Sequence, residues 1–296
     1  MSLGPQVTTK PLSASLGLEI RGLDLREVGT RTQFAEVKRL LVEHQVLAFK
    51  DQALEPDDLD AFTRLFGEPD QHVLREYALD GYPDIFVISN IVENGRPIGS
   101  RAEGFAWHTD LCYFEHPAAY TLLYALEVPP EGGDTLFTSL YRAYDALPDE
   151  EKARLKKLHI VHSYRTMYEA QARSKPLTAE QLARTPDVVH PMVRVHPDTG
   201  REGLYINKGT VKGIIGMDNE EAKRLIDRLF DFAKQERFVY AHKWSARDLV
   251  IWDNRGTLHT ATPYDMDRYR RLIYRTSVRG ERPVAAALRA ARDSVT

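Results

Sequence analysis

The segment Trp107-His108-Thr109-Asp110 places an imidazole and a carboxylate two residues apart in a chain of 296 residues. On an extended backbone, residues i and i+2 point to the same face, so His108 and Asp110 are expected to converge at the end of a strand. An imidazole together with a carboxylate suits a divalent metal ion of the iron type. The segment therefore predicts two ligands of a metal site, and a third must come from elsewhere in the chain.

The third ligand is expected from His259, which follows a predicted buried strand and a turn rich in Asp, Asn and Gly. Two histidines and one carboxylate on one face leave coordination positions open, an arrangement that marks mononuclear non-haem Fe(II) oxygenases. Zinc hydrolases often carry their ligands in a helical His-Glu-x-x-His motif, which this chain lacks. A zinc-dependent hydrolase built on His108, Asp110 and His259 remains the alternative.

A second His-x-Asp pattern occurs at His196-Pro197-Asp198. There the proline and the following Thr199-Gly200 favour a hairpin turn in which the Asp198 side chain bonds the backbone. We therefore expect this copy to form a turn and the copy at His108 to bind the metal.

Arginines gather in the segment 268–275, which is expected to contain a return strand at 270–277. Arg271 and Arg275 are four residues apart and share a strand face, whereas Arg270 points the other way. Two arginines inside a β-barrel are destabilising unless they meet anions, and a guanidinium can hold a carboxylate through two hydrogen bonds. The alternatives are a solvated basic edge strand, or a non-catalytic barrel that binds an anionic small molecule.

The composition is that of an ordinary globular protein, with 43% hydrophobic and 28% charged residues. The net charge of −3 argues against a nucleic-acid partner, which would need a basic surface. The single cysteine, Cys112, is expected to pack as a small residue, and one thiol excludes an intrachain disulfide and a polythiolate zinc site. The sequence shows no signal peptide and no apolar run that could cross a membrane, so we expect a cytoplasmic protein.

Hydrophobic periodicity predicts helices at 31–43, 56–66, 139–157 and 219–236, the last with Asn219 as its N-cap. Strands are expected at 46–49, 85–88, 119–128, 135–137, 203–206, 247–252 and 270–277. Residues 163–189 read as loops and short helices that form either a lid or an ordinary surface insertion. No repeat or composition shift divides the chain, so residues 1–296 are expected to form a single domain.

Several segments, in this order along the chain, resemble the TauD/TfdA family of Fe(II)- and 2-oxoglutarate-dependent oxygenases. They are Phe66-Gly67-Glu68, Trp107-His108-Thr109-Asp110, the Pro-Pro-Glu-Gly-Gly-Asp-Thr stretch at 129–135, Arg194-Val195-His196-Pro197, Trp252-Asp253-Asn254-Arg255, His259 and Arg270-Arg271. The resemblance covers nearly the whole chain. It implies a mainly β fold with α insertions, in which helices flank a double-stranded β-helix (jelly roll, cupin-like) core, and it suggests a homodimer or homotetramer.

The resemblance also implies roles for individual residues. The three predicted ligands match the family's Fe(II) ligands. Thr135 and Arg271 match the residues that hold the distal carboxylate of 2-oxoglutarate. Arg275 matches an arginine that binds the anionic group of the substrate in taurine dioxygenase, and His72 matches a histidine that contacts the substrate. Arg75 departs from the pattern, because the taurine enzyme has a tyrosine at that position.

The implied reaction consumes O2 and 2-oxoglutarate, releases succinate and CO2, and oxidises a C–H bond of a small anionic substrate. A sulfonate, a sulfate ester or a carboxylate is expected, and both taurine-like and aryloxyalkanoate-like compounds fit this description. Taurine itself is disfavoured, because Arg75 and the segment 101–106 differ from the taurine enzyme beside the substrate pocket.

Overall fold

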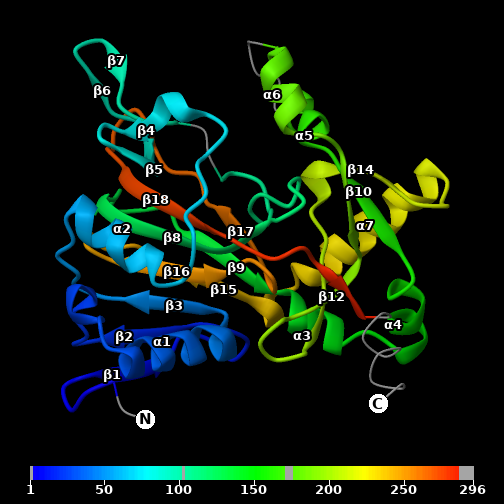
Figure 1. Cartoon of the computed structure of the whole chain (residues 1–296), viewed down its shortest axis with the longest axis horizontal. Helices are drawn as coiled ribbons and strands as arrows, with labels where there is room; N and C mark the ends of the chain where they lie inside the picture. The colour runs from blue at the N-terminus through cyan, green and yellow to red at the C-terminus, as the bar shows by residue number, and fades with distance from the viewer. Residues whose placement is uncertain (1–2, 102–103, 171–175, 287–296) are drawn as a thin grey trace.

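The computed structural model describes residues 3–101, 104–170 and 176–286 (Figure 1). Its framework is an eight-stranded sheet in which the β2–β3 pair runs parallel and the other described pairs run antiparallel. In spatial order, its strands are β1 (Thr8–Pro11), β2 (Leu18–Arg21), β3 (Val46–Phe49), β16 (Leu249–Asp253), β8 (Ala118–Glu127), β18 (Leu272–Arg279), β5 (Tyr82–Ser89) and β4 (Ala78–Leu79).

The remaining strands form smaller sheets. The sheet that matters for the site consists of β15 (Val239–His242), β9 (Thr135–Ser139) and β17 (Thr257–Ala261). The others are β11 (Val188–Pro191), β10 (His159–His162) and β14 (Val211–Ile214); β13 (Glu202–Leu204), β12 (Val193–Val195) and β19 (Val284–Ala285); and the hairpin β6 (Val92–Glu93) and β7 (Arg96–Pro97). No sheet closes on itself in the described part of the chain.

The α-helices of the described residues are α1 (Arg31–His44), α2 (Pro56–Arg64), α3 (Leu140–Asp145), α4 (Asp149–Leu155), α5 (Tyr164–Ala170), α6 (Ala179–Arg184) and α7 (Asn219–Ala233). Short 3-10 turns occur at Leu25–Glu27, Arg75–Tyr77, Lys208–Thr210 and Glu236–Phe238. Among the described residues, no helix has the length and apolar character needed to traverse a bilayer. The prediction of a mainly β protein with helices packed on it is confirmed.

Strand β8 explains the layering, because its alternate side chains enter two different cores. Leu122 packs with Leu41 and Phe62 of helices α1 and α2, which cover one face of the large sheet (Figure 1). Leu123 points to the opposite face and packs in the same core as Phe137 of β9. The sheet β15-β9-β17 therefore lies against the face that the two helices leave open, and the predicted site residues Thr135, His259 and Arg275 come from these two sheets.

Two local predictions differ from the structure. The single helix expected over 139–157 is split into α3 and α4, because Pro148 lies between them and a proline disfavours helical backbone in the residue before it. The N-cap of α7 is Asp218 rather than Asn219, and its carboxylate accepts hydrogen bonds from the backbone amides of Glu220 and Glu221.

The second His-x-Asp pattern forms the predicted hairpin between β12 and β13. The expected bonding pattern within the turn was wrong, because Nδ1 of His196 accepts from the backbone amides of Asp198 and Thr199. Asp198 instead forms an ion pair with Lys38, with 3.3 Å between Nζ and Oδ2. This pattern therefore has a structural role that is separate from the predicted metal site.

The segment 163–189 contains α5, α6 and the start of β11, as the prediction of short helices required. Helix α5 packs against the segment that follows Asp110 in the chain, because the rings of Tyr164 and Tyr113 lie 4.7 Å apart. Residues 171–175 of this segment lie outside the described residues, and the lid role remains a prediction.

Two buried histidines are expected to make the stability of the fold depend on pH. Burial lowers the pKa of His162 to about 3 and that of His190 to about 4, whereas an unfolded histidine titrates near pH 6.5. As the pH falls below about 6.5, the unfolded chain takes up protons that the folded chain excludes, so the free energy of unfolding decreases by up to about 1.4 kcal/mol per pH unit for each residue. Urea unfolding at pH 7 and pH 5 measures this decrease.

The matched variant is His162→Asn, whose amide can keep the contact that Nδ1 of His162 makes with the Thr210 hydroxyl at 2.7 Å. It is expected to lose less stability than the wild type between pH 7 and pH 5, because one titrating group is gone. Equal losses in the two proteins would show that His162 does not set the pH dependence.

Candidate active site

His108 and His259 are brought together by the backbone. The amide of His108 donates to the carbonyl of His259 at 2.9 Å, and the amide of His259 donates back to His108 at 2.8 Å. This isolated antiparallel bridge places the two imidazole centroids 4.1 Å apart. Asp110 follows in a turn rather than on a continuing strand, so the turn, and not the predicted strand alternation, directs its carboxylate toward the two rings.

The three predicted ligands converge on one point. Nε2 of His108 lies 3.6 Å from Oδ1 of Asp110, and Nε2 of His259 lies 3.7 Å from Oδ2. One ligand atom from each of the three residues lies within 4.8 Å of the other two, and no other cluster of this kind occurs among the described residues. The arrangement can hold a single metal ion between two nitrogen donors and one oxygen donor.

The protonation states suit metal binding. Burial by itself would raise the pKa of Asp110, but the positive charge of Arg275, which is the largest opposing effect, holds this pKa well below its ordinary value. Burial lowers the pKa of His259 well below its ordinary value, so its ring is neutral. Nδ1 of His108 lies 2.6 Å from the carbonyl oxygen of Ala106, which assigns the proton to Nδ1 and leaves Nε2 as a donor to a metal.

Arg271 lines the same hollow as the two histidines. The residue is only 4% exposed, and its Nε has no hydrogen-bond partner among the described residues. Burial lowers the pKa of Arg271, and no described carboxylate lies within ion-pair distance to offset this effect. A buried cation of this kind is costly unless an anion joins it, so the hollow is suited to an anionic ligand.

Thr135, at the start of β9, lines the same hollow as Arg271. Nε1 of Trp244 donates to the Thr135 hydroxyl oxygen at 3.0 Å. The hydroxyl proton therefore remains available for an acceptor inside the hollow. The structure thus brings Thr135 and Arg271 together, as the resemblance implied, and adds Trp244 behind them.

Arg275 lies on β18, between β8 and β5, so the alternative of a solvated basic edge strand is wrong. Its Nη2 donates to Oδ1 of Asp110 at 2.8 Å, and both side chains are buried. Arg270 points the other way, as expected, and pairs with Glu127 at the surface. The predicted substrate-binding arginine is therefore also an ion-pair partner of the candidate metal ligand.

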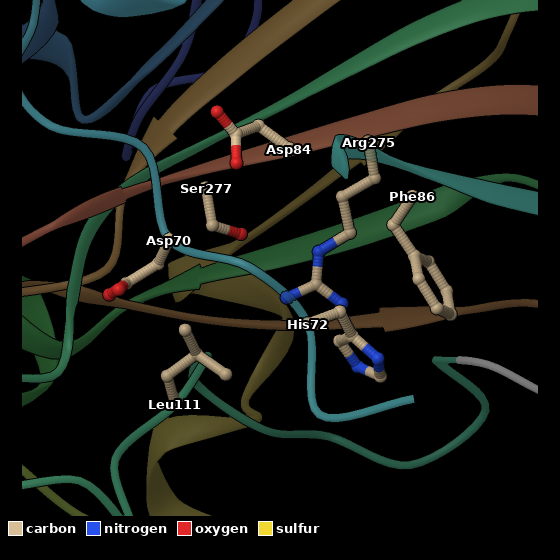
Figure 2. Close-up of a pocket in the computed structure, with 7 residues that line it drawn as sticks. All are labelled: Asp70, His72, Asp84, Phe86, Leu111, Arg275 and Ser277. Atoms are coloured by element: carbon tan, nitrogen blue, oxygen red, sulfur yellow. The ribbon is translucent and has the colours of Figure 1, made fainter. Parts of the chain in front are cut away.

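Arg275 also lines a second, smaller hollow together with His72, as predicted from the resemblance (Figure 2). Figure 2 shows the guanidinium of Arg275 directed toward the imidazole of His72. This imidazole lies against Phe86, with 4.0 Å between the ring centroids and 41° between the ring planes. Arg75, which the resemblance placed beside the substrate pocket, is exposed and lines neither hollow. It lies in the 3-10 turn Arg75–Tyr77, none of whose residues is buried.

Three polar contacts of the site were not anticipated from the sequence. Thr121 donates to Oδ2 of Asp110 at 2.7 Å, Asn254 donates to Thr121 at 2.9 Å, and Trp244 donates to Thr135. Asn254 lies within a segment that carries the family resemblance, and this was the available signal for it. Thr121 and Trp244 gave no comparable signal, because each lies far in sequence from the residue that it contacts.

The family model for the taurine catabolism dioxygenase TauD, TfdA family matches residues 8–277. The chain is 34% identical to pentalenolactone F synthase from Streptomyces avermitilis over 281 residues, which cover 90% of this chain and 91% of that protein. It is 33% identical to the alpha-ketoglutarate-dependent 2,4-dichlorophenoxyacetate dioxygenase of Cupriavidus pinatubonensis over 282 residues, which cover 92% of this chain and 98% of the relative.

The fold is also similar to that of solved structures. A taurine dioxygenase from Burkholderia xenovorans superposes with a TM-score of 0.80 at 32% identity, over 95% of this chain and 92% of the other. Family model, sequence relatives and structural neighbour thus agree over nearly the whole chain, and they confirm the prediction of a 2-oxoglutarate-dependent dioxygenase. The chain therefore belongs to the taurine catabolism dioxygenase TauD, TfdA family.

Proposed function

We propose that this chain is an Fe(II)- and 2-oxoglutarate-dependent oxygenase that uses O2 to oxidise a C–H bond of a small anionic substrate, with succinate and CO2 as co-products. The observation that carries the proposal is the hollow shared by the His108 and His259 imidazoles and by the buried Arg271, whose Nε has no hydrogen-bond partner among the described residues. A metal ion would bind the two imidazoles, and a dicarboxylate that reaches from this metal ion to Arg271 would neutralise the guanidinium.

The donor set fits a ferrous ion held by His108, Asp110 and His259. Two neutral imidazoles and one ionised carboxylate leave coordination positions open, as mononuclear non-haem iron oxygenases require. When bound, the iron and 2-oxoglutarate supply the activation of O2 and the oxidising power. The family match favours this reading over a zinc-dependent hydrolase and over a non-catalytic anion-binding barrel, and both alternatives become outcomes of the test below.

The protein's own residues bind and orient the cosubstrate. Arg271 offers a planar fork of N–H donors to the distal carboxylate of 2-oxoglutarate. Thr135 adds a hydroxyl donor whose orientation is supported by Trp244. Because Arg271 is buried, water competes poorly for it, and the dicarboxylate is held in a single orientation beside the histidines.

The substrate is proposed to be a sulfonate, a sulfate ester or a carboxylate whose anionic group meets Arg275 and His72 in the smaller hollow. This class agrees with the name of the relative that acts on 2,4-dichlorophenoxyacetate, although the other relative is named for pentalenolactone F. Among the described residues that line this hollow, Arg275 is the one arginine or lysine, and His72 lies beside it. Asp70 and Asp84 line it as well, but their carboxylates are paired with Arg279 and Arg64.

A screen for succinate formation over anionic compounds is expected to find activation by taurine-like or aryloxyalkanoate-like compounds and none by their uncharged analogues. The His72→Leu variant should weaken this discrimination, because it removes a polar group beside the proposed anion site and leaves the ion pair between Arg275 and Asp110 in place. Equal activation by charged and uncharged compounds would contradict the proposed substrate class.

We further propose that the two facing sheets form the halves of a jelly roll and that residues 1–296 act as one domain. The large sheet supplies Arg275 and the sheet β15-β9-β17 supplies Thr135 and His259, so the site requires both sheets. A homodimer or homotetramer and a cytoplasmic location remain predictions from the sequence.

The oxygenase proposal is tested by anaerobic addition of Fe(II) and 2-oxoglutarate to the metal-free protein. A weak visible charge-transfer band is expected, because the keto acid must bind the metal directly, and a chelator should abolish the band. A folded, metal-loaded protein without the band would contradict the proposal. Hydrolytic activity without O2 would favour the zinc hydrolase, and ligand binding that chelators leave unchanged would favour the non-catalytic barrel.

A further inference from the structure

The carboxylate of Asp110 is held on both sides by side chains that do not belong to the ligand set. Oδ1 accepts from Nη2 of Arg275 at 2.8 Å, and Oδ2 accepts from the hydroxyl of Thr121 at 2.7 Å. Asp110 is buried, so water has little access to these positions. The direction of the carboxylate is therefore determined by two fixed donors.

Thr121 is well placed to hold a fixed position. It lies in the middle of the large sheet on β8, paired with Trp252 on β16 and Ser277 on β18, and it is fully buried. A β-branched side chain on a central strand has restricted rotamers, so its hydroxyl keeps one direction.

Asn254 determines where the Thr121 proton goes. Its Nδ2 donates to the Thr121 hydroxyl oxygen at 2.9 Å. Because a hydroxyl has only one proton and here already accepts a hydrogen bond, that proton is directed to Oδ2 of Asp110. The hydrogen-bond network also fixes the amide of Asn254, since its Oδ1 accepts from Nε1 of Trp252 at 3.0 Å and from the backbone amide of Asp110 at 3.2 Å.

We propose that Thr121 and Asn254 are positioning residues for the metal site: they hold the Asp110 carboxylate in its ligating direction before a metal arrives. The inference rests on the proposed metal site and adds a role for two residues that do not touch the ion. Because Asp110 is already oriented in the folded protein, metal binding does not have to restrict its side chain. Loss of the Thr121 hydroxyl removes part of this orientation and therefore weakens metal binding. Outer-shell changes of this kind typically lower metal affinity by about 10- to 100-fold.

The test is a titration of the metal-free full-length protein with Mn(II) alone, in the wild type and in two variants of one residue. Thr121→Val replaces the hydroxyl by a methyl group of similar size, and its Mn(II) dissociation constant is expected to rise by roughly 10- to 100-fold. Thr121→Ser keeps the hydroxyl and should restore affinity to within about threefold of the wild type. The readout is metal affinity, which a purely structural hydroxyl would leave unchanged in folded protein.

Thr63→Val is the matched control. Thr63 lies on helix α2 and is also fully buried. Its hydroxyl forms hydrogen bonds with the Leu59 carbonyl oxygen and with the Thr276 hydroxyl. Both valine variants leave a polar partner unsatisfied, so both should lower the free energy of unfolding, but Thr63→Val should bind Mn(II) as the wild type does. If Thr121→Val fails to fold, the smaller Thr121→Ala takes its place.

The outcomes separate this inference from the proposed function. Unchanged Mn(II) affinity in folded Thr121→Val or Thr121→Ala overturns the positioning role, and so does an equal loss in Thr63→Val. If the wild type fails to bind Mn(II), or if Asp110→Asn binds it as tightly as the wild type, the proposed metal site itself is wrong.

Discussion

Replacing Arg271 by methionine is expected to weaken 2-oxoglutarate binding by roughly 30-fold to several thousand-fold, the range for removing one partner of a buried charged contact of about 2–5 kcal/mol. Methionine keeps an apolar stem of similar length but removes all the N–H donors that would meet the distal carboxylate. Calorimetric titration with 2-oxoglutarate in the presence of Mn(II) and without O2 measures the effect. The affinity of Arg271→Lys for 2-oxoglutarate should fall between those of the wild type and Arg271→Met, because lysine keeps the charge and loses the planar set of N–H donors.

Although Arg271→Met weakens cosubstrate binding, it should not lower the free energy of unfolding of the unliganded protein. Arg271 is a buried cation without a described carboxylate partner, so its removal takes away the unfavourable desolvation free energy of this charge in the unliganded protein. Arg271→Met is therefore expected to unfold at the same or a higher urea concentration than the wild type. Arg270→Met, at the exposed neighbour that pairs with Glu127, serves as the control and should leave cosubstrate binding unchanged. Normal 2-oxoglutarate affinity in Arg271→Met would refute the assigned role.

Asp110→Asn is expected to abolish metal binding and to destabilise the fold as well. The amide has the shape of the carboxylate but lacks its charge, so the loss of Mn(II) affinity should exceed the roughly 10- to 100-fold that is typical of outer-shell changes. The variant also leaves Arg275 buried without its ion-pair partner, which costs about 3–5 kcal/mol. Mn(II) titration and urea unfolding of the same preparations measure both effects.

The double variant Asp110→Asn with Arg275→Met is expected to recover most of the lost stability, because no unpaired charge remains, while Mn(II) binding stays absent. Asp198→Asn is the matched control. It alters the other His-x-Asp pattern, where the aspartate is partly exposed and pairs with Lys38, so neither quantity should change appreciably. If Asp110→Asn kept both its stability and its metal, Asp110 would be neither a ligand nor a buried ion-pair partner.

Much of the site was predictable because the identity and spacing of its residues indicate which chemistry they can perform. The spacing of His108 and Asp110 indicated a shared face, and His259 offered the missing imidazole. The order of the family-like segments then implied roles for Thr135 and Arg271. The geometry agrees with these expectations: the three ligands converge, and Arg271 lines the same hollow.

The remaining features depend on contacts between distant segments. No spacing rule indicates that His108 would form a two-hydrogen-bond bridge with His259, or that Thr121 on a largely apolar strand would meet Asp110. The ion pair between Arg275 and Asp110 follows from the position of β18 next to β8, which the sequence does not specify. Arg75 lies in an exposed 3-10 turn and lines neither hollow, which its position in the sequence did not indicate.

The two hollows have Arg275 as their single common wall residue among those that line them. The smaller one is formed largely by residues of the 70–86 region, whereas the larger one draws on β8, β9, β16 and β17. Changes around His72 and Phe86 are therefore expected to alter which molecule the proposed substrate hollow accepts without disturbing the proposed cosubstrate hollow. This separation allows substitutions in the smaller hollow to change substrate specificity during evolution while the proposed metal and cosubstrate sites are kept. A protein designer can use the same separation to direct the fold to a new substrate.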